Sequence, residues 1–174
     1  GFCPSLIAAS LKSFTPGPEN TPGRMNFFKV RDFHVMVDFA HNKAGYKAIG
    51  EFVSMMPVSR KIGIISGVGD RRDEDIIACG SLASEMFDHV IIRQEKSLRG
   101  RTSQQITSLL MQGIRSKNAD ITCESIDDEH EAIIHALSIA TPDSLVVALC
   151  DRVASVIELV KNAADLPTAE PVLK

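Results

Sequence analysis

Five short apolar runs, each followed by a stretch with helical periodicity, constrain the fold of this chain more than any other feature. The runs are residues 34–38, 61–66, 89–93, 120–125 and 144–149, and the helical stretches are residues 44–56, 76–87, 106–114, 133–140 and 153–160. Strands that alternate with amphipathic helices are typical of βαβ units. The pattern therefore predicts an α/β domain with a mainly parallel sheet and helices on both faces.

Local helix signals agree with this prediction. Thr102 and Gln105 have the spacing of a capping box, and Asp128 and Glu131 have the same spacing. We expect the apolar stripes of the helices, including the pair Met55–Met56, to form the core.

A segment rich in proline and glycine, residues 15–23, follows a short helical pattern at residues 5–14. Such a segment is typical of a linker. We therefore expect residues 1–22 to be the end of a preceding domain plus the linker. Residues 23–165 are then one domain, and residues 166–174 are a tail.

The composition narrows the possible partners. The 174 residues include 19 basic and 22 acidic ones, for a formal net charge of −3. Nucleic acid is not expected as a partner, because binding it usually requires a clustered basic face. A membrane is not expected either, because no apolar run approaches the ~20 residues that span a bilayer. The four cysteines lack metal-ligand spacing, which predicts no metal site and a reducing compartment, the cytoplasm.

Polar residues follow the predicted strands at the points where the strands end. They occupy residues 38–42, 67–73, 94–101 and 151–152. Because the carboxyl ends of parallel strands meet at the edge where open α/β sheets bind ligands, we expect one site there. Asp38, His41 and Asn42 supply a carboxylate, an imidazole and an amide that suit a phosphate or a sugar hydroxyl.

Each of these features also has a purely structural interpretation. A single histidine is usually structural or solvated, and we expect this of His34, His89, His130 and His135; the position of His41 after a strand-end acid favours function. The glycines near Asp70 match neither the Walker pattern nor the G-x-G-x-x-G fingerprint. A tight turn with Asp70 as the N-cap of the next helix explains them equally well. The charges at residues 70–75 are also compatible with a solvated first helical turn.

Taken together, five motifs in order resemble the C-terminal domain of Mur-type ligases. They are residues 21–26 (TPGRMN), 37–42 (VDFAHN), 67–75 (GVGDRRDED), 99–102 (RGRT) and 145–153 (LVVALCDRV). The last two narrow the resemblance to the cyanophycin synthetase group, and the motifs span nearly the whole chain. The resemblance implies a Rossmann-like three-layer domain with a mainly parallel sheet.

The resemblance also implies a reaction. Such ligases use ATP to phosphorylate a carboxylate, and an amine then attacks the acyl phosphate to form an amide. In the cyanophycin synthetase group, arginine is added to the aspartate side-chain carboxylate of a polymer. The P-loop and most Mg²⁺ ligands belong to the preceding central domain, so this chain alone is expected to be inactive. Homo-oligomers through the full-length protein fit the same picture.

Site residues carried over by motif fall into three groups. Arg24 and Asp38 would reach the nucleotide, around its ribose, and Lys43, although it departs from the motif, would lie beside the phosphates of the nucleotide. His41 and Asn42 would face the phosphates as catalytic residues. Residues expected to border the amino-acid pocket are Gly67, Gly69, Asp70, Arg71, Asp73, Glu95, Arg101 and Asp151.

An arginine substrate requires a carboxylate partner for its guanidinium group. The sequence leaves the choice open among Glu95, Asp73, Asp75 and Asp151.

Lys43 departs from the family, in which proline usually follows the His-Asn pair. Proline at the first helical position pre-sets the backbone, whereas Lys43 adds positive charge beside the phosphates. The change is also compatible with another substrate. Alternative functions are therefore a Mur ligase of peptidoglycan synthesis, a folylpolyglutamate synthase-like ligase, or a non-catalytic assembly domain.

Overall fold

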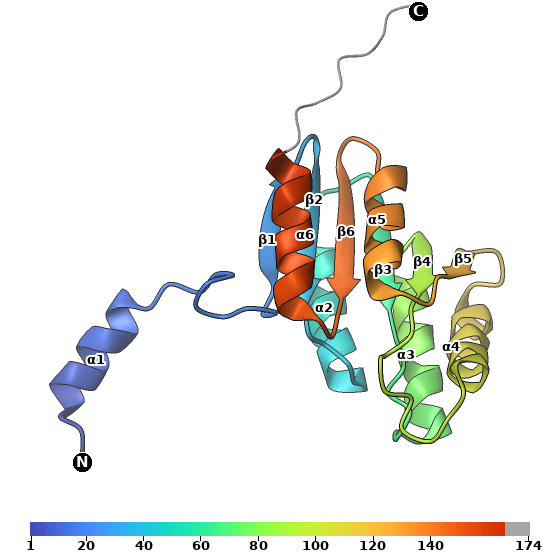
Figure 1. Cartoon of the computed structure of the whole chain (residues 1–174), viewed down its shortest axis with the longest axis horizontal. Helices are drawn as coiled ribbons and strands as arrows, with labels where there is room; N and C mark the ends of the chain where they lie inside the picture. Colours follow the sequence, from blue (N-terminus) through green and yellow to red (C-terminus); the bar gives the residue numbers. More distant parts are fainter. Residues whose placement is uncertain (166–174) are drawn as a thin grey trace, which may run out of the picture.

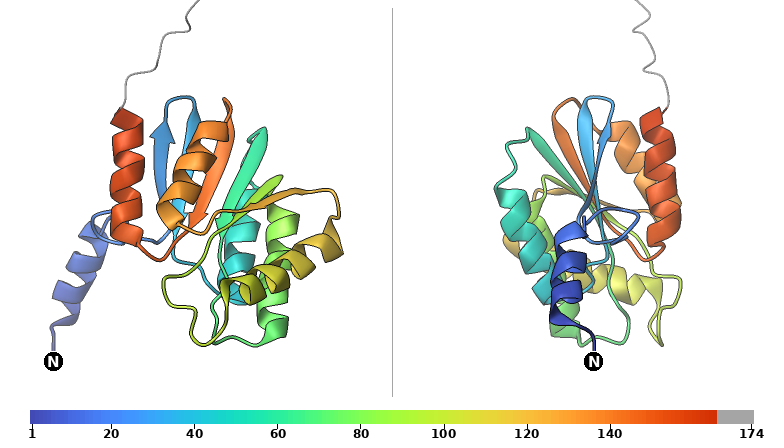
Figure 2. Two further views of the ribbon diagram at one scale, coloured as in Figure 1. Left: turned by 45° about the vertical axis from the view of Figure 1, so that its right-hand side comes forward. Right: turned by 90° about the vertical axis from the view of Figure 1, so that its left-hand side faces the viewer.

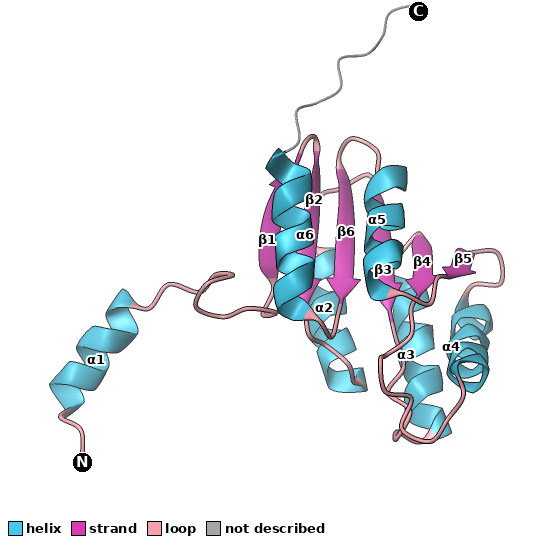
Figure 3. Ribbon diagram, in the orientation of Figure 1, coloured by secondary structure: helices cyan, strands magenta, loops and turns pink. Residues whose placement is uncertain are grey.

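The computed structural model describes residues 1–165 and contains one six-stranded sheet (Figures 1 and 3). Its strands are β1 (Asn26–Val30), β2 (Phe33–Asp38), β3 (Arg60–Ile65), β4 (His89–Ile92), β5 (Thr122–Ser125) and β6 (Ser144–Leu149). The order across the sheet is β1-β2-β6-β3-β4-β5, and all neighbouring pairs are parallel except β1 and β2. The mainly parallel sheet predicted from the sequence is thus confirmed.

Strand β1 was not predicted. It pairs antiparallel with β2 through a tight connection at Arg31 and Asp32, where Arg31 adopts a φ of 54°. Positions with positive φ in hairpin turns are usually occupied by Gly, Asn or Asp, which signal the turn in a sequence. Arg31 is none of these. The strand's mixed burial, with only its first and last residues buried, also gives no regular alternation.

Six helices complete the described chain: α1 (Pro4–Ser13), α2 (Lys43–Ser54), α3 (Asp73–Met86), α4 (Ser103–Lys117), α5 (Glu129–Ile139) and α6 (Val153–Asp165). Helices α2, α3 and α4 cover one face of the sheet, and α5 and α6 cover the other (Figure 2). Alternate strand residues divide between the two faces: Met36 and Val147 pack toward α2–α4, whereas Val35 and Val146 pack toward α5 and α6. The fold is therefore the Rossmann-like three-layer α/β fold that we predicted.

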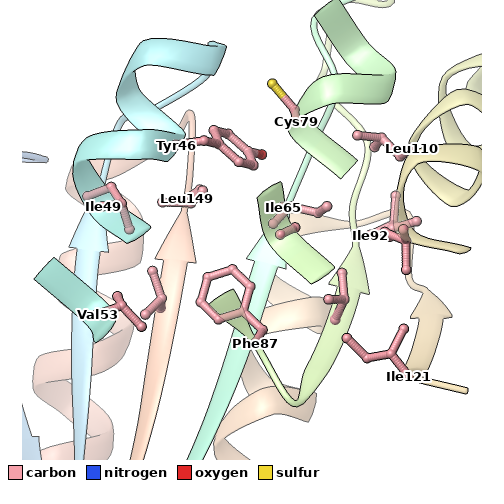
Figure 4. Close-up of a cluster of buried hydrophobic side chains, with 14 of the residues drawn as sticks. Tyr46, Ile49, Val53, Ile65, Cys79, Phe87, Ile92, Leu110, Ile121 and Leu149 are labelled. Carbon is pink, nitrogen blue, oxygen red and sulfur yellow. The ribbon is translucent and has the colours of Figure 1, made fainter. Parts of the chain in front are cut away.

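The core beneath α2 and α3 is closely packed around Phe87 (Figure 4). Glycine at position 63 of β3 makes this possible, because a Cβ there would lie 2.1 Å from Cδ2 of the Phe87 ring. The prediction for the Met55–Met56 pair was wrong in part. Met55 is 73% exposed because α2 ends at Ser54, and Met56 packs half-buried against the core.

Helix α1 confirms the helical pattern predicted near the N-terminus. It has no buried residue and lies apart from the sheet (Figure 1). An ion pair of 2.6 Å between Glu19 and Lys161 ties the following segment to α6. The domain limits at residues 22 and 165 remain expectations, and the tail at residues 166–174 lies outside the described residues. No helix within residues 1–165 has the length and apolar character needed to cross a bilayer.

The helix caps show where local sequence signals succeed and fail. Thr102 and Gln105 form the predicted capping box. Asp128 caps α5 by accepting from the backbone N–H groups of residues 130 and 131. The alternative interpretation of Asp70 as the cap of the next helix does not hold, because α3 begins later, with Arg72 as its N-cap residue and no side-chain cap. The carboxylate of Asp70 instead pairs with Arg99 at 2.8 Å.

Candidate functional site

Three cavities lie along the carboxyl edge of the sheet, where the parallel strands end. The linker cavity, of about 450 Å³, is lined by Arg24, Met25, Asp38, Phe39, Ala40, His41, Asn42, Gly45, Ala48 and Ile49. The basic cavity, of about 370 Å³, is lined by His41, Asn42, Lys43, Ala44, Ser66, Gly67, Val68, Arg71, Asp75, Ile76 and Cys79. The acidic cavity, of about 320 Å³, is lined by Arg93, Gln94, Glu95, Lys96, Asp127, Asp128, Glu129, Asp151 and Arg152.

Asp38 organises the linker cavity. Its Oδ2 accepts from the backbone N–H of Met25 at 2.8 Å, and its Oδ1 accepts from that of Ala40 at 2.7 Å. The carboxylate is 8% exposed and so fixes the chain after the linker to the loop after β2. The guanidinium carbon of Arg24 lies 5.8 Å from the centre of the Phe39 ring, a cation–π contact that places Arg24 over this loop.

His41 and Asn42 form the wall shared by the linker and basic cavities. The Nδ1 of His41 lies 2.9 Å from the carbonyl oxygen of Phe39, and the two rings are 4.9 Å apart. Because a carbonyl only accepts, Nδ1 carries the proton in this bond. The Nε2 atom can then donate to a ligand only in the imidazolium form. Asn42 caps α2 by accepting from the backbone N–H of Gly45 at 2.9 Å.

The basic cavity suits an anion. It opens at the N-terminus of α2, where the backbone N–H groups of the first turn and the helix dipole favour negative charge. Lys43 and Arg71 are exposed in its lining and make no ion pair within residues 1–165, while Asp75 pairs with Arg72 at 3.0 Å. Burial raises the pKa of the Cys79 thiol to about 11, so this group remains a neutral part of the wall.

The loop after β3 is held by residues that we had predicted to contact substrate. Arg101 donates from Nε to the carbonyl of Gly69 and from Nη2 to that of Arg71, both at 2.8 Å, and pairs with Asp73 at 2.7 Å. A Cβ at Gly69 would lie 2.0 Å from the carbonyl oxygen of Leu98, so glycine is required for this approach.

Gly69, Asp70, Asp73 and Arg101 therefore line none of the three cavities. In this structure they shape the loop that borders the basic cavity. Gly67 and Arg71, by contrast, line that cavity directly.

Glu95 is the buried carboxylate that makes no hydrogen bond or ion pair within residues 1–165. It is 9% exposed and lines the acidic cavity. Burial, together with the negative charge of Asp151, raises the pKa of Glu95 above its usual range. The positive charges of Arg93 and Arg99, with a smaller contribution from His41, oppose that shift.

Sequence reasoning missed a buried ion pair beneath the acidic cavity. Arg93 and Glu129 are each 2% exposed, and Nε of Arg93 lies 3.0 Å from Glu129 Oε2. Arg93 also pairs with Asp151 at 3.0 Å. The available signal was a charged residue at the end of an otherwise apolar strand, since Arg93 directly follows β4.

The structure thus places nine of the predicted site residues in the linings of the three cavities. The linker and basic cavities are lined by Arg24, Asp38, His41, Asn42, Lys43, Gly67 and Arg71. The acidic cavity is lined by Glu95 and Asp151, and Asp151 is already paired with Arg93. Within residues 1–165, no group of three or more His, Cys, Asp or Glu side chains is arranged to hold a metal ion.

Comparisons with known proteins agree with this architecture. A family model described as "Mur ligase, glutamate ligase domain" matches residues 23–151. The chain is 42% identical over 157 residues to a cyanophycin synthetase from Geminocystis herdmanii (strain PCC 6308). The match covers 90% of this chain and 18% of that protein.

Two solved structures share the fold. A UDP-N-acetylmuramoyl-L-alanyl-D-glutamate–2,6-diaminopimelate ligase matches with a TM-score of 0.69 and 20% identity, over 92% of this chain and 37% of the other. A Mycobacterium tuberculosis folylpolyglutamate synthase complexed with ADP matches with a TM-score of 0.66 and 19% identity, over 91% of this chain and 35% of the other.

Proposed function

The chain belongs to the Mur ligase, glutamate ligase domain family, and from this premise we propose that it is the C-terminal domain of an ATP-dependent amide ligase of the cyanophycin synthetase type. The chain spans 18% of the length of that curated relative, so the activity of the whole protein is part of the proposal. We further propose that the amine is arginine, the acceptor is an aspartate side-chain carboxylate, and the location is the cytoplasm.

In the proposed reaction, ATP supplies the phosphoryl group that activates the acceptor carboxylate, and phosphate leaves when the amine forms the amide. The residues of this domain bind and orient the reactants. Arg24 and the loop fixed by Asp38 border the nucleotide on the linker side. Lys43, Arg71 and the N-terminus of α2 face its phosphates. His41 in its imidazolium form donates from Nε2 to negative charge that develops there.

Mg²⁺ does not enter this assignment of roles. The described residues offer no cluster of acidic or imidazole ligands for it. In the proposed full-length protein the metal and the P-loop belong to the preceding domain, so the chain alone is expected to bind ATP weakly and to form no amide.

The observation that carries the proposal is the shared wall of His41 and Asn42 between two cavities. One cavity brings Arg24 and Asp38 together, and the other brings Lys43 and Arg71 together. The family motifs assign Arg24 and Asp38 to the nucleotide, and Lys43 follows them at the position where the family has proline. Arg71 was expected at the amino-acid pocket, and its place in the lining of the basic cavity is the reason that we propose it for the phosphates instead.

The test is His41→Ala in the full-length ligase, assayed for ATP-dependent incorporation of arginine into an aspartate polymer. We expect kcat to fall by roughly 100-fold or more, the usual cost of removing a group that stabilises transition-state charge. His34→Ala is the matched control, because His34 lies near the opposite end of β2 and lines none of the three cavities. Full activity in both His41→Ala and Asp38→Ala would contradict the assignment.

The same assay separates the alternatives. A full-length protein that uses nucleotide-linked muropeptides, or that adds glutamate to folate, would instead be a Mur ligase of peptidoglycan synthesis or a folylpolyglutamate synthase-like enzyme. A protein inactive with all three acceptors would be the non-catalytic domain.

A further inference from the structure

The acidic cavity contains more negative than positive side chains, yet most of them already have partners. Asp151 pairs with Arg93, Asp128 pairs with Arg152, and Glu129 pairs with both arginines. Glu95 and Asp127 make no such contact within residues 1–165, and of these two only Glu95 is buried.

Arg93 joins the ends of β4 and β6. Its Nε and Nη2 donate to the carbonyl of Leu149 at 3.2 and 3.1 Å, and its Nη1 donates to Asp151 Oδ2 at 3.0 Å. The guanidinium group is nearly inaccessible to solvent, so it is unavailable to any ligand. Its role is to hold the strand ends and to occupy the carboxylate of Asp151.

Glu129 acts on the same loop from α5. Its Oε2 accepts from the backbone N–H of Asp151 at 2.8 Å, and its Oε1 accepts from that of Arg152 at 3.0 Å. Two backbone bonds and two arginine contacts leave this carboxylate fully used. The loop between β6 and α6 is therefore fixed at the rim of the cavity.

A buried ion pair is not explained by stability alone. Replacing such a pair by apolar residues of similar volume is often neutral or stabilising, because two charges must be taken out of water. The arrangement here has one consequence at the surface of the cavity: Asp151 is engaged by Arg93, whereas Glu95 makes no hydrogen bond or ion pair within residues 1–165.

We propose that Arg93 and Glu129 are positioning residues of the amine site, which commit Asp151 to the protein and leave Glu95 as the carboxylate that binds the guanidinium group of the incoming amino acid. This inference rests on the proposed ligase function. A guanidinium suits the position because it offers several N–H donors in a plane and remains charged when it is removed from water. It would also relieve the repulsion between Glu95 and Asp151.

The test compares Glu95→Gln with Asp151→Asn in the full-length ligase, with arginine and its neutral analogue citrulline as substrates. We expect Glu95→Gln to raise KM for arginine at least tenfold, while KM for ATP and for citrulline changes less than twofold. We expect Asp151→Asn to change KM for arginine less than threefold, because that carboxylate is already occupied. Equal increases in the two variants, or an equal increase for citrulline in Glu95→Gln, would overturn the proposal.

The double variant Arg93→Met/Glu129→Met tests the positioning role. It removes both charges of the buried pair together, so neither is left unpaired, but it also frees the backbone N–H groups of Asp151 and Arg152. Circular dichroism therefore checks that the double variant folds before KM is measured. Releasing Asp151 and the loop should raise KM for arginine at least fivefold with KM for ATP unchanged, a split that a merely structural role would not produce. An unchanged KM for arginine in a folded double variant would refute the role of the pair.

These outcomes are distinct from failure of the proposed function. If the wild-type ligase incorporates no arginine, both proposals fall together. If it incorporates arginine but the variants show the reverse pattern, only the assignment of Glu95, Arg93 and Glu129 is wrong.

Discussion

Lys43 and Arg71 in the basic cavity are exposed and make no ion pair within residues 1–165, whereas Arg93 and Glu129 beneath the acidic cavity are each 2% exposed and paired. The two cavities lie on the same edge of one sheet, so the difference does not come from topology. An exposed charge without an ion-pair partner has a small cost in free energy because water solvates it, while a buried charge requires a partner. The charged side chains of the basic cavity are thus available to a ligand, whereas most of those in the acidic cavity form ion pairs that hold the structure.

The largest effect that this comparison predicts is on stability at Glu129. Glu129→Ala leaves the buried Arg93 short of a partner and frees two backbone N–H groups, so we expect a loss of about 3–5 kcal/mol in the free energy of unfolding. Urea denaturation of the chain measures it. Glu85→Ala is the control, because Glu85 pairs with Lys117 at an exposed site and should cost less than about 1 kcal/mol. Equal losses of unfolding free energy in the two variants would contradict the contrast between the buried and the exposed ion pair.

A smaller effect is expected at the shared wall. Asn42→Ala removes the N-cap of α2 and should cost about 1 kcal/mol, which lowers Tm by roughly 2–4 °C for a chain of this size. Thr102→Ala removes the cap of α4 and should cost a similar amount. Only Asn42→Ala should also raise KM for ATP in the full-length ligase. If KM for ATP rises in both variants, the cause is the lost stability and not the position of Asn42 at the cavity wall.

Lys43→Pro tests whether the positive charge of Lys43 in the basic cavity is used. Asn42 is extended, with a φ of −147° and a ψ of 165°, which is compatible with a following proline. We expect proline at this first helical position to stabilise the chain by about 0.4–1 kcal/mol while KM for ATP rises. Lys43→Ala should raise KM for ATP without the gain in stability. A Lys43→Pro variant with unchanged KM for ATP would show that the charge is not used.

The smallest effects concern pH, and they have opposite signs at two carboxylates. Burial raises the pKa of Glu95, so the folded state binds this proton more tightly and stability falls as pH rises above the unfolded pKa. Glu95→Gln should therefore gain stability relative to wild type between acid and neutral pH.

Asp128 provides the contrast. The hydrogen bond from the Glu131 backbone lowers the pKa of Asp128, so its stabilisation is present above the unfolded pKa and is lost as pH falls. Asp128→Asn should be destabilising at neutral pH and equal to wild type in acid. Thermal unfolding across pH 3–8 measures both differences, and parallel curves for the two variants would contradict this account.

The sequence predicted most of the fold because the central strands and their helices carry strong periodic signals. The parallel strands were found within two residues of their ends, and β6 at residues 144–149 matched in full. Strand β1 was missed because the positive φ of its turn is at Arg31, where a sequence signal would require Gly, Asn or Asp. Met55 was misplaced because periodicity does not show that α2 stops one residue earlier.

The candidate site was less predictable, for a physical reason. Residues beside one another in the chain, such as His41 and Asn42, were placed correctly at a strand end. Which charged groups pair with each other depends on elements that are distant in the sequence. Arg101 donates to the carbonyl of Gly69 in the loop after β3, and Arg93 forms an ion pair with Glu129 of α5. The spacing of residues in a sequence does not encode these pairings. It therefore could not show which of Glu95, Asp73, Asp75 and Asp151 remains free.

The most direct test of the two-cavity account is a steady-state measurement of KM for ATP and for arginine in Lys43→Ala and Glu95→Gln of the full-length ligase. The account predicts that Lys43→Ala raises KM for ATP and leaves KM for arginine within twofold of wild type. It predicts the reverse for Glu95→Gln. If either variant raises both constants equally, or if the two effects are exchanged, the basic and acidic cavities do not have the separate roles assigned to them.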